Sequence, residues 1–192
     1  MNNKKYILLI MTFFFLLFTL SVCGQKITKN VSLNETKKEL AEWKTFRGTN
    51  YSIQYPTNWE LNQSGQMGSS FILFSPLDSD NDKFKENLNL LVQDLTGLNI
   101  DLDKFVEISE VQVKTIVTNS KLIESKRMRN TTPEFHKMVY TGDQGIFQLK
   151  FEQYFWVINQ QAYILTLTCE QNKFSNYKEI GEKILKSLSF KK

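Results

Sequence analysis

The sequence predicts an α+β domain in which helices pack on the faces of a central, mostly antiparallel sheet. Three observations lead to this fold. The aromatic and β-branched stretch from Gly145 to Glu170 alternates with period two around an interruption at residues 159–161, which is typical of a β-hairpin. Two other stretches repeat apolar residues at three- and four-residue steps, the pattern of an amphipathic helix. Shorter alternating stretches between them supply further strands.

The predicted hairpin forms the centre of the sheet. One face of its first strand carries Phe147, Leu149, Phe151, Phe155 and Val157. The second strand, from Ala162 to Cys169, is apolar or small on both faces. A strand without a polar face is expected to be covered on both sides. We therefore place this second strand in the middle of the sheet.

The other strands and a first helix are predicted from shorter patterns. A short helix is expected at residues 35–43, with Trp43 and Phe46 as its apolar anchors. Alternation predicts strands at residues 51–55, 70–75, 87–95, 121–129 and 134–140. Pro56 ends the first of these strands, because proline has no N–H to donate to a ladder.

Two longer helices complete the predicted fold. The first runs over residues 102–118, and Asp101 can cap its N-terminus. The second runs over residues 174–188, with its apolar residues on one face. Its lysines are expected to point toward solvent: Lys173, Lys178, Lys183 and Lys186.

Length and composition fit one folded domain behind a leader. The chain has 192 residues, of which 41% are hydrophobic, so global disorder is excluded. The formal net charge is only +4, and no basic stripe with interleaved aromatics is present, which argues against nucleic-acid binding. The densest basic stretch reads as a solvated strand edge, and its residues are Lys121, Lys126, Arg127 and Arg129.

Residues 1–24 have the pattern of an export signal: a basic start, an apolar run and small residues. Signal peptidase would cut after Gly24 and leave Gln25 first. Alternatively, residues 20–23 resemble a bacterial lipobox, and Cys23 would be lipidated, although Val22 departs from that motif. Plain secretion is slightly favoured, and an uncleaved anchor is a third alternative. Both processing routes place the mature domain outside the cytoplasm, in the periplasm, in the medium or on the membrane as a lipoprotein.

The predicted organisation therefore has three parts. Residues 1–24 are the export signal, residues 25–42 are a tether with the short helix, and residues 43–192 form the domain. Only Cys23 and Cys169 are present, so no disulfide is expected within the mature chain. Cys169 is interpreted as a buried, inert thiol.

The motif Tyr51-Ser-Ile-Gln-Tyr-Pro-Thr-Asn-Trp59 resembles the opening of PsbP-like domains. Similar motifs follow in the family's order at residues 74–76, 86–89, 161–168 and 184–190. The resemblance spans residues 43–192 and implies an α/β/α sandwich around a central antiparallel sheet. It also implies a scaffold used mostly for binding or assembly, including in bacterial secreted proteins and lipoproteins. No functional residues carry over, because the matching positions look like packing residues.

The candidate chemical groups do not form a recognised set. His136, on a predicted strand, has no second metal ligand in the sequence, so a packed or surface histidine is favoured over a base or ligand. Nothing in the sequence brings His136 and Cys169 together as a nucleophilic pair. The alternating Asp78, Asp80 and Asp82 superficially resemble a calcium loop but lack the glycine and glutamate of an EF-hand. We interpret this loop as solvated, and expect no catalytic residue, cofactor or metal.

The leading functional hypothesis is an exported, non-enzymatic module that binds a protein partner in the cell envelope or outside the cell. We expect a monomer that meets the membrane only through its leader or a lipid on Cys23. The alternative is a carrier of a small molecule or lipid, with a pocket between sheet and helix. A hydrolase is the third hypothesis.

Overall fold

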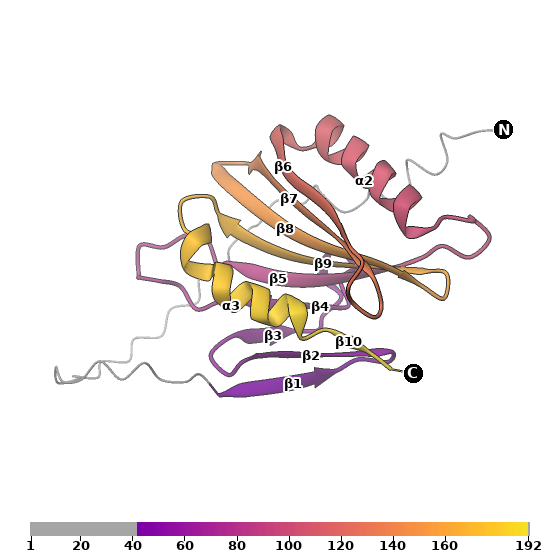
Figure 1. Cartoon of the computed structure of the whole chain (residues 1–192). Coiled ribbons are helices and arrows are strands. Elements are labelled where there is room, and N and C mark those ends of the chain that lie inside the picture. The colour runs from indigo at the N-terminus through magenta and orange to yellow at the C-terminus, as the bar shows by residue number, and fades with distance from the viewer. Residues whose placement is uncertain (1–41, 192) are drawn as a thin grey trace.

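The computed structural model of the chain describes residues 42–191. Two helices of this part of the chain are α2 (Leu102–Ile116) and α3 (Phe174–Lys186), and η2 (Gln66–Gly68) is a 3₁₀ turn. The strands are β1 (Trp43–Arg47), β2 (Tyr51–Pro56), β3 (Glu60–Asn62), β4 (Phe71–Phe74), β5 (Asn87–Asp94), β6 (Thr118–Met128), β7 (Phe135–Gln144), β8 (Phe147–Ile158), β9 (Gln161–Glu170) and β10 (Ser189–Phe190). They form a seven-stranded and a three-stranded sheet (Figure 1).

The predicted hairpin is confirmed as the centre of the large sheet. Its strand order is β3-β4-β5-β9-β8-β7-β6, and every neighbouring pair is antiparallel. Ile158 pairs with Gln161, so Asn159 and Gln160 form a two-residue turn, both with positive φ, as tight hairpins require. All residues of β9 between Ala162 and Cys169 are buried, which confirms that this strand is covered on both faces.

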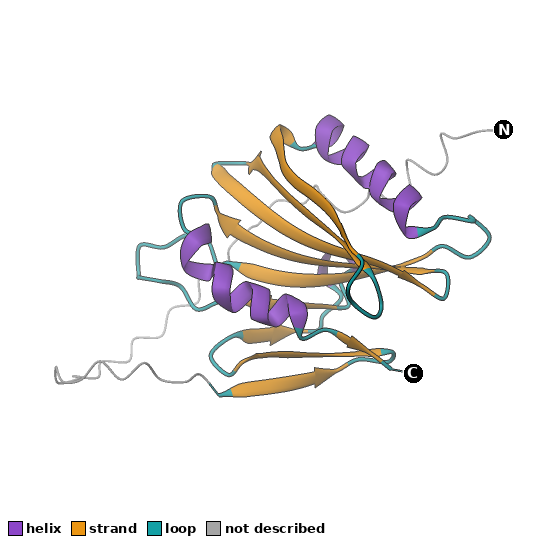
Figure 2. Cartoon of the chain, viewed as in Figure 1, coloured by secondary structure: helices purple, strands orange, loops and turns teal. Residues whose placement is uncertain are grey.

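The two faces of the large sheet are covered differently (Figure 2). On one face, α2 packs against β6, β7 and β8 through residues such as Phe105 and Val113. On the other face, α3 packs on β9 and β2 and shares a core with the three-stranded sheet, whose order is β1-β2-β10. The expected sandwich is therefore correct only in part, because a small second sheet occupies one of its outer layers beside α3.

The predicted short helix at residues 35–43 is wrong where it can be compared with the structure. Residues 35–41 lie outside the described residues, but Trp43 begins strand β1. Phe46, the second expected anchor, is in the same strand and makes an edge contact with the Phe71 ring at a centroid distance of 5.5 Å. The aromatic and β-branched composition of this segment suits a strand better than a helix, and β2 supplies the antiparallel partner.

The remaining elements agree with the sequence apart from their ends. Asp101 caps α2 as predicted and accepts a hydrogen bond from the Lys104 amide at 2.8 Å. This helix ends at Ile116 and β6 already begins at Thr118, because β-branched residues at this junction favour extended backbone. Strands β3 and β10 were not predicted, since three and two residues carry too little periodicity. Three residues of the basic stretch, Lys121, Lys126 and Arg127, lie on β6, an edge strand as expected, and Arg129 directly follows it.

A glycine allows α3 to approach β9 closely. A Cβ atom at Gly181 would lie 2.4 Å from Leu167 Cδ2 and 3.1 Å from Leu167 Cδ1. Leu167 is fully buried, so it has no free space into which to move. The helix can therefore sit at this distance only with glycine at position 181.

We expect Gly181→Ala to lower the free energy of unfolding by about 1–3 kcal/mol, because overpacking outweighs the gain in helix propensity. Chemical denaturation measures the difference. The matched control is Asn176→Ala on the exposed side of α3, which should stay within about 0.5 kcal/mol of the parent protein. Equal stabilities for the two variants would contradict the close packing at Gly181.

Candidate functional site

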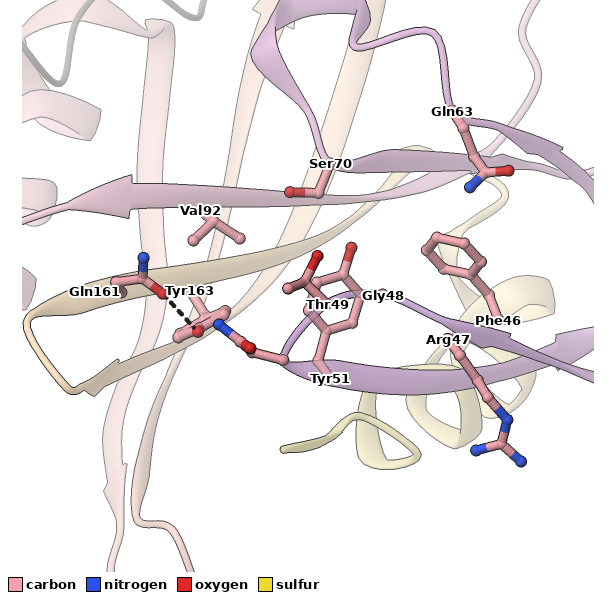
Figure 3. Close-up of a pocket in the computed structure, with 11 residues that line it drawn as sticks. Phe46, Arg47, Gly48, Thr49, Tyr51, Gln63, Ser70, Val92, Gln161 and Tyr163 are labelled. Atoms are coloured by element: carbon pink, nitrogen blue, oxygen red, sulfur yellow. Dashed lines mark hydrogen bonds between the residues drawn. The ribbon is translucent and has the colours of Figure 1, made fainter. Parts of the chain in front are cut away.

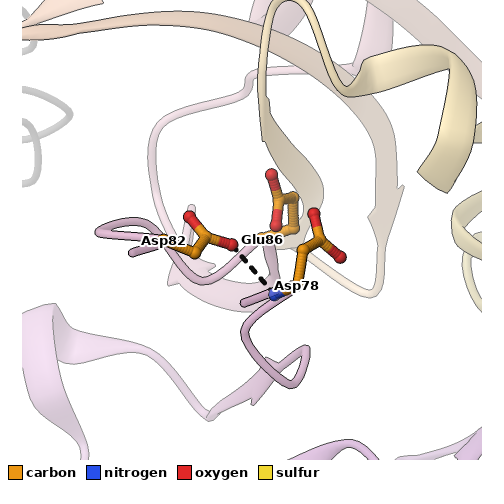
Figure 4. Close-up of side chains that lie close together, drawn as sticks. All are labelled: Asp78, Asp82 and Glu86. Carbon is orange, nitrogen blue, oxygen red and sulfur yellow. Dashed lines mark hydrogen bonds between the residues drawn. The ribbon is translucent and has the colours of Figure 1, made fainter. Parts of the chain in front are cut away.

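Three acidic side chains meet at the loop between β4 and β5. One carboxylate oxygen from each of Asp78, Asp82 and Glu86 lies within 4.8 Å of the others. In Figure 4, Glu86 lies between Asp82 and Asp78. Asp82 also orders the loop, because its carboxylate accepts hydrogen bonds from the backbone amides of Asp78 at 3.0 Å and Phe84 at 3.2 Å. The loop is thus folded around its acidic side chains.

The sheet register brings a lysine from a distant part of the sequence to this loop. Strand β5 begins directly after Glu86, and Asn87 pairs with Thr168 near the end of β9. The connection from β9 to α3 therefore passes beside the acidic loop. The Nζ atom of Lys173 in this connection has four carboxylate neighbours: Glu170 Oε2 at 2.8 Å, Asp82 Oδ1 at 2.9 Å, Asp78 Oδ2 at 3.4 Å and Glu86 Oε1 at 4.0 Å.

These contacts correct two predictions. Lys173 was expected to point toward solvent, but its side chain is only 22% exposed. The acidic loop was expected to be solvated, which holds for Asp80 but not for Asp82, whose side chain is 3% exposed. The reason is the same in both cases: the ammonium group and the carboxylates neutralise one another away from water.

The protonation equilibria of the loop follow from burial and from this lysine. Burial opposes ionisation of Asp82, but the Lys173 ammonium and two backbone amides outweigh it and lower the pKa of Asp82. Burial also works against the charged form of Lys173, and Glu170 and Asp82 reverse this effect and raise its pKa. The pKa of Glu86 is raised, mainly by burial.

Glu86 is the least satisfied member of the group. It is fully buried, and its Oε1 atom has no hydrogen-bond partner. Lys173 Nζ, at 4.0 Å, is too distant for a hydrogen bond. The Oε1 atom of Glu152, the other fully buried glutamate among the described residues, also has no hydrogen-bond partner, but Lys137 Nζ lies 3.3 Å from it, closer than Lys173 Nζ lies to Glu86. Glu86 therefore carries the weaker compensation of the two.

Aromatic residues hold the acidic loop against α3. The Tyr177 hydroxyl donates a hydrogen bond to Asp78 Oδ1 at 2.6 Å. The Tyr177 ring in turn makes an edge contact with Trp59 at a centroid distance of 6.4 Å. Burial and the hydrogen bond to Asp78 raise the pKa of Tyr177, so it remains a neutral donor at physiological pH.

A separate pocket of about 600 Å³ opens between the two sheets. Its wall includes Tyr51 and the turn from β1 to β2, together with Val92 of β5 and Tyr163 of β9 (Figure 3). The Tyr163 hydroxyl donates to Gln161 Oε1 at 2.8 Å. The sequence hypothesis placed a carrier pocket between sheet and helix, whereas this pocket lies between sheets, because the unpredicted small sheet covers this part of the core.

His136 lies on the α2 side of the large sheet, in a polar contact. Its Nε2 atom is 2.7 Å from Ser125 Oγ, and the Ser125 hydroxyl donates a hydrogen bond to Glu110 of α2. The hydroxyl has one hydrogen, so His136 must donate to Ser125 through Nε2–H. A general base would instead accept the serine proton. The contact thus ties β6 and β7 to α2 and does not activate Ser125.

Cys169 and His136 do not meet. Cys169 is fully buried in the core shared with α3, whereas His136 faces α2 on the opposite side of the sheet. Burial raises the pKa of the Cys169 thiol, which disfavours a reactive thiolate. The predicted burial of this cysteine is confirmed, and the nucleophilic pair is absent from the described part of the chain.

Solved structures with a similar backbone place this fold among known proteins. PsbP of the cyanobacterium Synechocystis matches with a TM-score of 0.58 at 11% identity, over 83% of this chain and 99% of its own. LpqN of Mycobacterium tuberculosis, involved in cell envelope biogenesis, matches with a TM-score of 0.57 at 12% identity, over 80% of this chain and 93% of its own. The fold is PsbP-like.

A third PsbP-like match is a Pseudomonas aeruginosa protein of unknown function. It aligns with a TM-score of 0.57 at 13% identity, over 78% of this chain and 98% of its own. The sequence itself matches no protein-family model and no curated protein. The resemblance read from the motifs is therefore confirmed at the level of the fold.

The motif that suggested the PsbP-like fold consists of packing residues, as expected. Tyr51, Ile53, Tyr55 and Trp59 are all buried in the core shared with α3. The residues proposed for processing, Cys23, Gly24 and Gln25, lie outside the described residues. Over residues 42–191, none of the helices has the length and apolar character needed to span a membrane.

Only part of the acidic group is predictable from the sequence. Asp78 and Asp82 were noticed for their spacing, but Asp80, noticed with them, lies outside the group. Glu86 directly precedes the strand predicted at residues 87–95, and Glu170 and Lys173 follow it by more than 80 residues. Only the pairing of β5 with β9 brings these side chains together, and no local sequence signal encodes that pairing.

The single histidine of the chain makes one titration easy to follow. Burial lowers the pKa of His136; Arg127 adds to this effect and Glu110 opposes it. The unfolded chain then binds the proton more tightly than the folded protein. The free energy of unfolding is therefore highest above the pKa of His136 in the unfolded chain, about 6.5. It decreases as the pH falls through this value toward the lower pKa of the folded protein.

We therefore expect the imidazole NMR signals of the folded protein to titrate below about 6.5. We also expect His136→Asn to remove part of the loss of stability between about pH 7.5 and 5.5, measured by chemical denaturation. Asp80→Asn, in an exposed loop, is the control and should keep the parent's pH dependence in this range. A titration midpoint above about 6.5 would contradict the assigned environment.

Proposed function

We propose that this chain is an exported, non-enzymatic binding or assembly module of the cell envelope. The observation that carries the proposal is the PsbP-like fold, matched over 93% of LpqN, a protein involved in cell envelope biogenesis. The predicted export signal at residues 1–24 supports the same location. PsbP of Synechocystis shares the fold at only 11% identity to this chain, so the same scaffold can carry very different surface residues. In this proposal the surface residues of each protein determine which partner it binds.

The contacts of the reactive groups support a role without chemistry. Ser125 donates its proton to Glu110 rather than to His136. The Cys169 thiol is buried. These groups contribute to packing and to links between elements, as expected of a scaffold that presents a surface to a partner.

The processing of the leader tests the proposed location. We expect the intact mass of the protein recovered from its host to begin at Gln25 in a soluble exported fraction, or at a lipidated Cys23 in the membrane fraction. Cys23→Ala is the control: it should abolish membrane association only if Cys23 is lipidated. An unprocessed protein in the cytoplasmic fraction would overturn the proposal.

The proposal that the module is not an enzyme can be tested with the purified protein. Turnover of ester, peptide or glycoside substrates by the purified protein, lost in Ser125→Ala or His136→Asn, would contradict the proposed binding role. Crosslinking in intact cells should instead capture the module with a protein of the envelope.

A carrier of a small molecule is the second candidate, favoured by the pocket of about 600 Å³ between the sheets. Its wall combines the rings of Tyr51 and Tyr163 with the Arg47 side chain and with hydroxyl and amide groups. This mostly polar lining suits a small polar ligand held by hydrogen bonds.

If this candidate is correct, native mass spectrometry of protein from its own host should show a stoichiometric ligand. Val92→Trp should then displace the ligand by filling the pocket, whereas Val111→Trp, at an exposed position of α2 outside the pocket wall, should retain it. An empty parent protein would remove the support for the carrier function.

A further inference from the structure

The carboxylates of the β4–β5 loop are spaced so that they can share one ion. Calcium binds carboxylate oxygens at about 2.3–2.6 Å, so two oxygens on the same ion are at most about 5 Å apart. The oxygens offered by Asp78, Asp82 and Glu86 lie within 4.8 Å of one another. They therefore meet this limit without a rearrangement of the backbone.

The charge of this group is only partly neutralised. Four carboxylates, those of Asp78, Asp82, Glu86 and Glu170, surround the single ammonium group of Lys173. Lys173 Nζ lies at hydrogen-bond distance from Asp82 and Glu170 but not from Glu86. Two of these carboxylates, those of Asp82 and Glu86, are almost fully removed from water, so water screens their negative charge poorly and a further cation is attracted.

Glu86 gives an independent indication of a ligand. Its carboxylate is fully buried, and Oε1 lies on the side that faces the group, without a hydrogen-bond partner. A buried carboxylate oxygen left in this state has a substantial desolvation cost. A cation bound among Glu86, Asp82 and Asp78 would offset that cost directly.

We propose that Asp78, Asp82 and Glu86 form a binding site for a divalent cation of the calcium class, for which the Lys173 ammonium competes. The site offers only hard oxygen ligands in an irregular arrangement, which suits calcium better than the small, strictly octahedral magnesium ion. This site goes beyond the proposed binding function and does not depend on it.

The Lys173 ammonium can move away from the three ligands and still keep one of its ion-pair partners. Its side chain is 22% exposed and is bonded to Glu170 at 2.8 Å, so it can turn toward Glu170 and water. The ion would then hold the β4–β5 loop, while Tyr177 links Asp78 to α3. Cation binding should therefore stabilise the contact between this loop and the helix.

The aromatic residues beside the site provide a direct readout. Terbium(III) replaces calcium at oxygen sites and emits when nearby aromatic rings are excited. Tyr177 is hydrogen-bonded to Asp78, and Trp59 contacts the Tyr177 ring. We expect saturable terbium emission from the purified protein, displaced by Ca²⁺ at lower concentrations than by Mg²⁺, and a melting temperature that rises with Ca²⁺.

Four variants separate the site from general surface binding. Asp82→Asn and the isosteric Glu86→Gln should each weaken terbium and Ca²⁺ binding by at least about 10-fold. Asp80→Asn removes a charge from the same loop outside the group and should bind like the parent. Lys173→Met removes the competing ammonium, so it should bind both ions more tightly and gain more stability from Ca²⁺ than the parent does.

Circular dichroism tests whether each variant is folded. If Lys173→Met does not fold, the comparison of Glu86→Gln with Asp80→Asn decides the question alone. Terbium emission that does not saturate, or that falls equally in Asp80→Asn and Glu86→Gln, overturns the site. So does a folded Lys173→Met variant whose melting temperature does not respond to Ca²⁺. In those cases Lys173 is the permanent counter-ion of the loop.

Discussion

The burial of strand β9 on both faces is the constraint on which the rest of this structure depends. Antiparallel pairing with β5 and β8 satisfies its backbone, and its alternate side chains enter two different cores. A slip of one residue would exchange these two sets. Helix α2 is needed to cover one set, and α3 with the small sheet is needed to cover the other. The order of the outer elements follows from this division.

The structure compensates its buried charges in two different ways. Glu152 on β8 and Lys137 on β7 lie diagonally across two neighbouring strands, and their ion pair is made within the sheet. At the β4–β5 loop, by contrast, one lysine from a distant connection serves four carboxylates. Lys137 also lies 3.3 Å from Glu124, so one ammonium group serves two carboxylates within the sheet and four at the loop. The cation site proposed above rests on this difference.

The sequence predicted the parts of the fold that have a strong period. The hairpin of β8 and β9 and helices α2 and α3 are long enough for their patterns to be unambiguous. Strands β1, β3 and β10 have five, three and two residues, and pairing rather than propensity determines them. For the same reason only part of the acidic group was predicted. Glu86 and Lys173 are brought together by the pairing of distant strands, and no local sequence pattern indicates that pairing.

The small sheet also has a mechanical consequence. Strand β2 is paired with β1 on one side and with β10 on the other, both antiparallel to it, so both ends of the described chain are held by one strand (Figure 1). Residue 42 leaves at the Pro56 end of β2, and Lys191 leaves at the Asn50 end, where its amide donates to the Asn50 carbonyl. Tension between these ends would shear β1 and β10 along β2 and load their hydrogen bonds together.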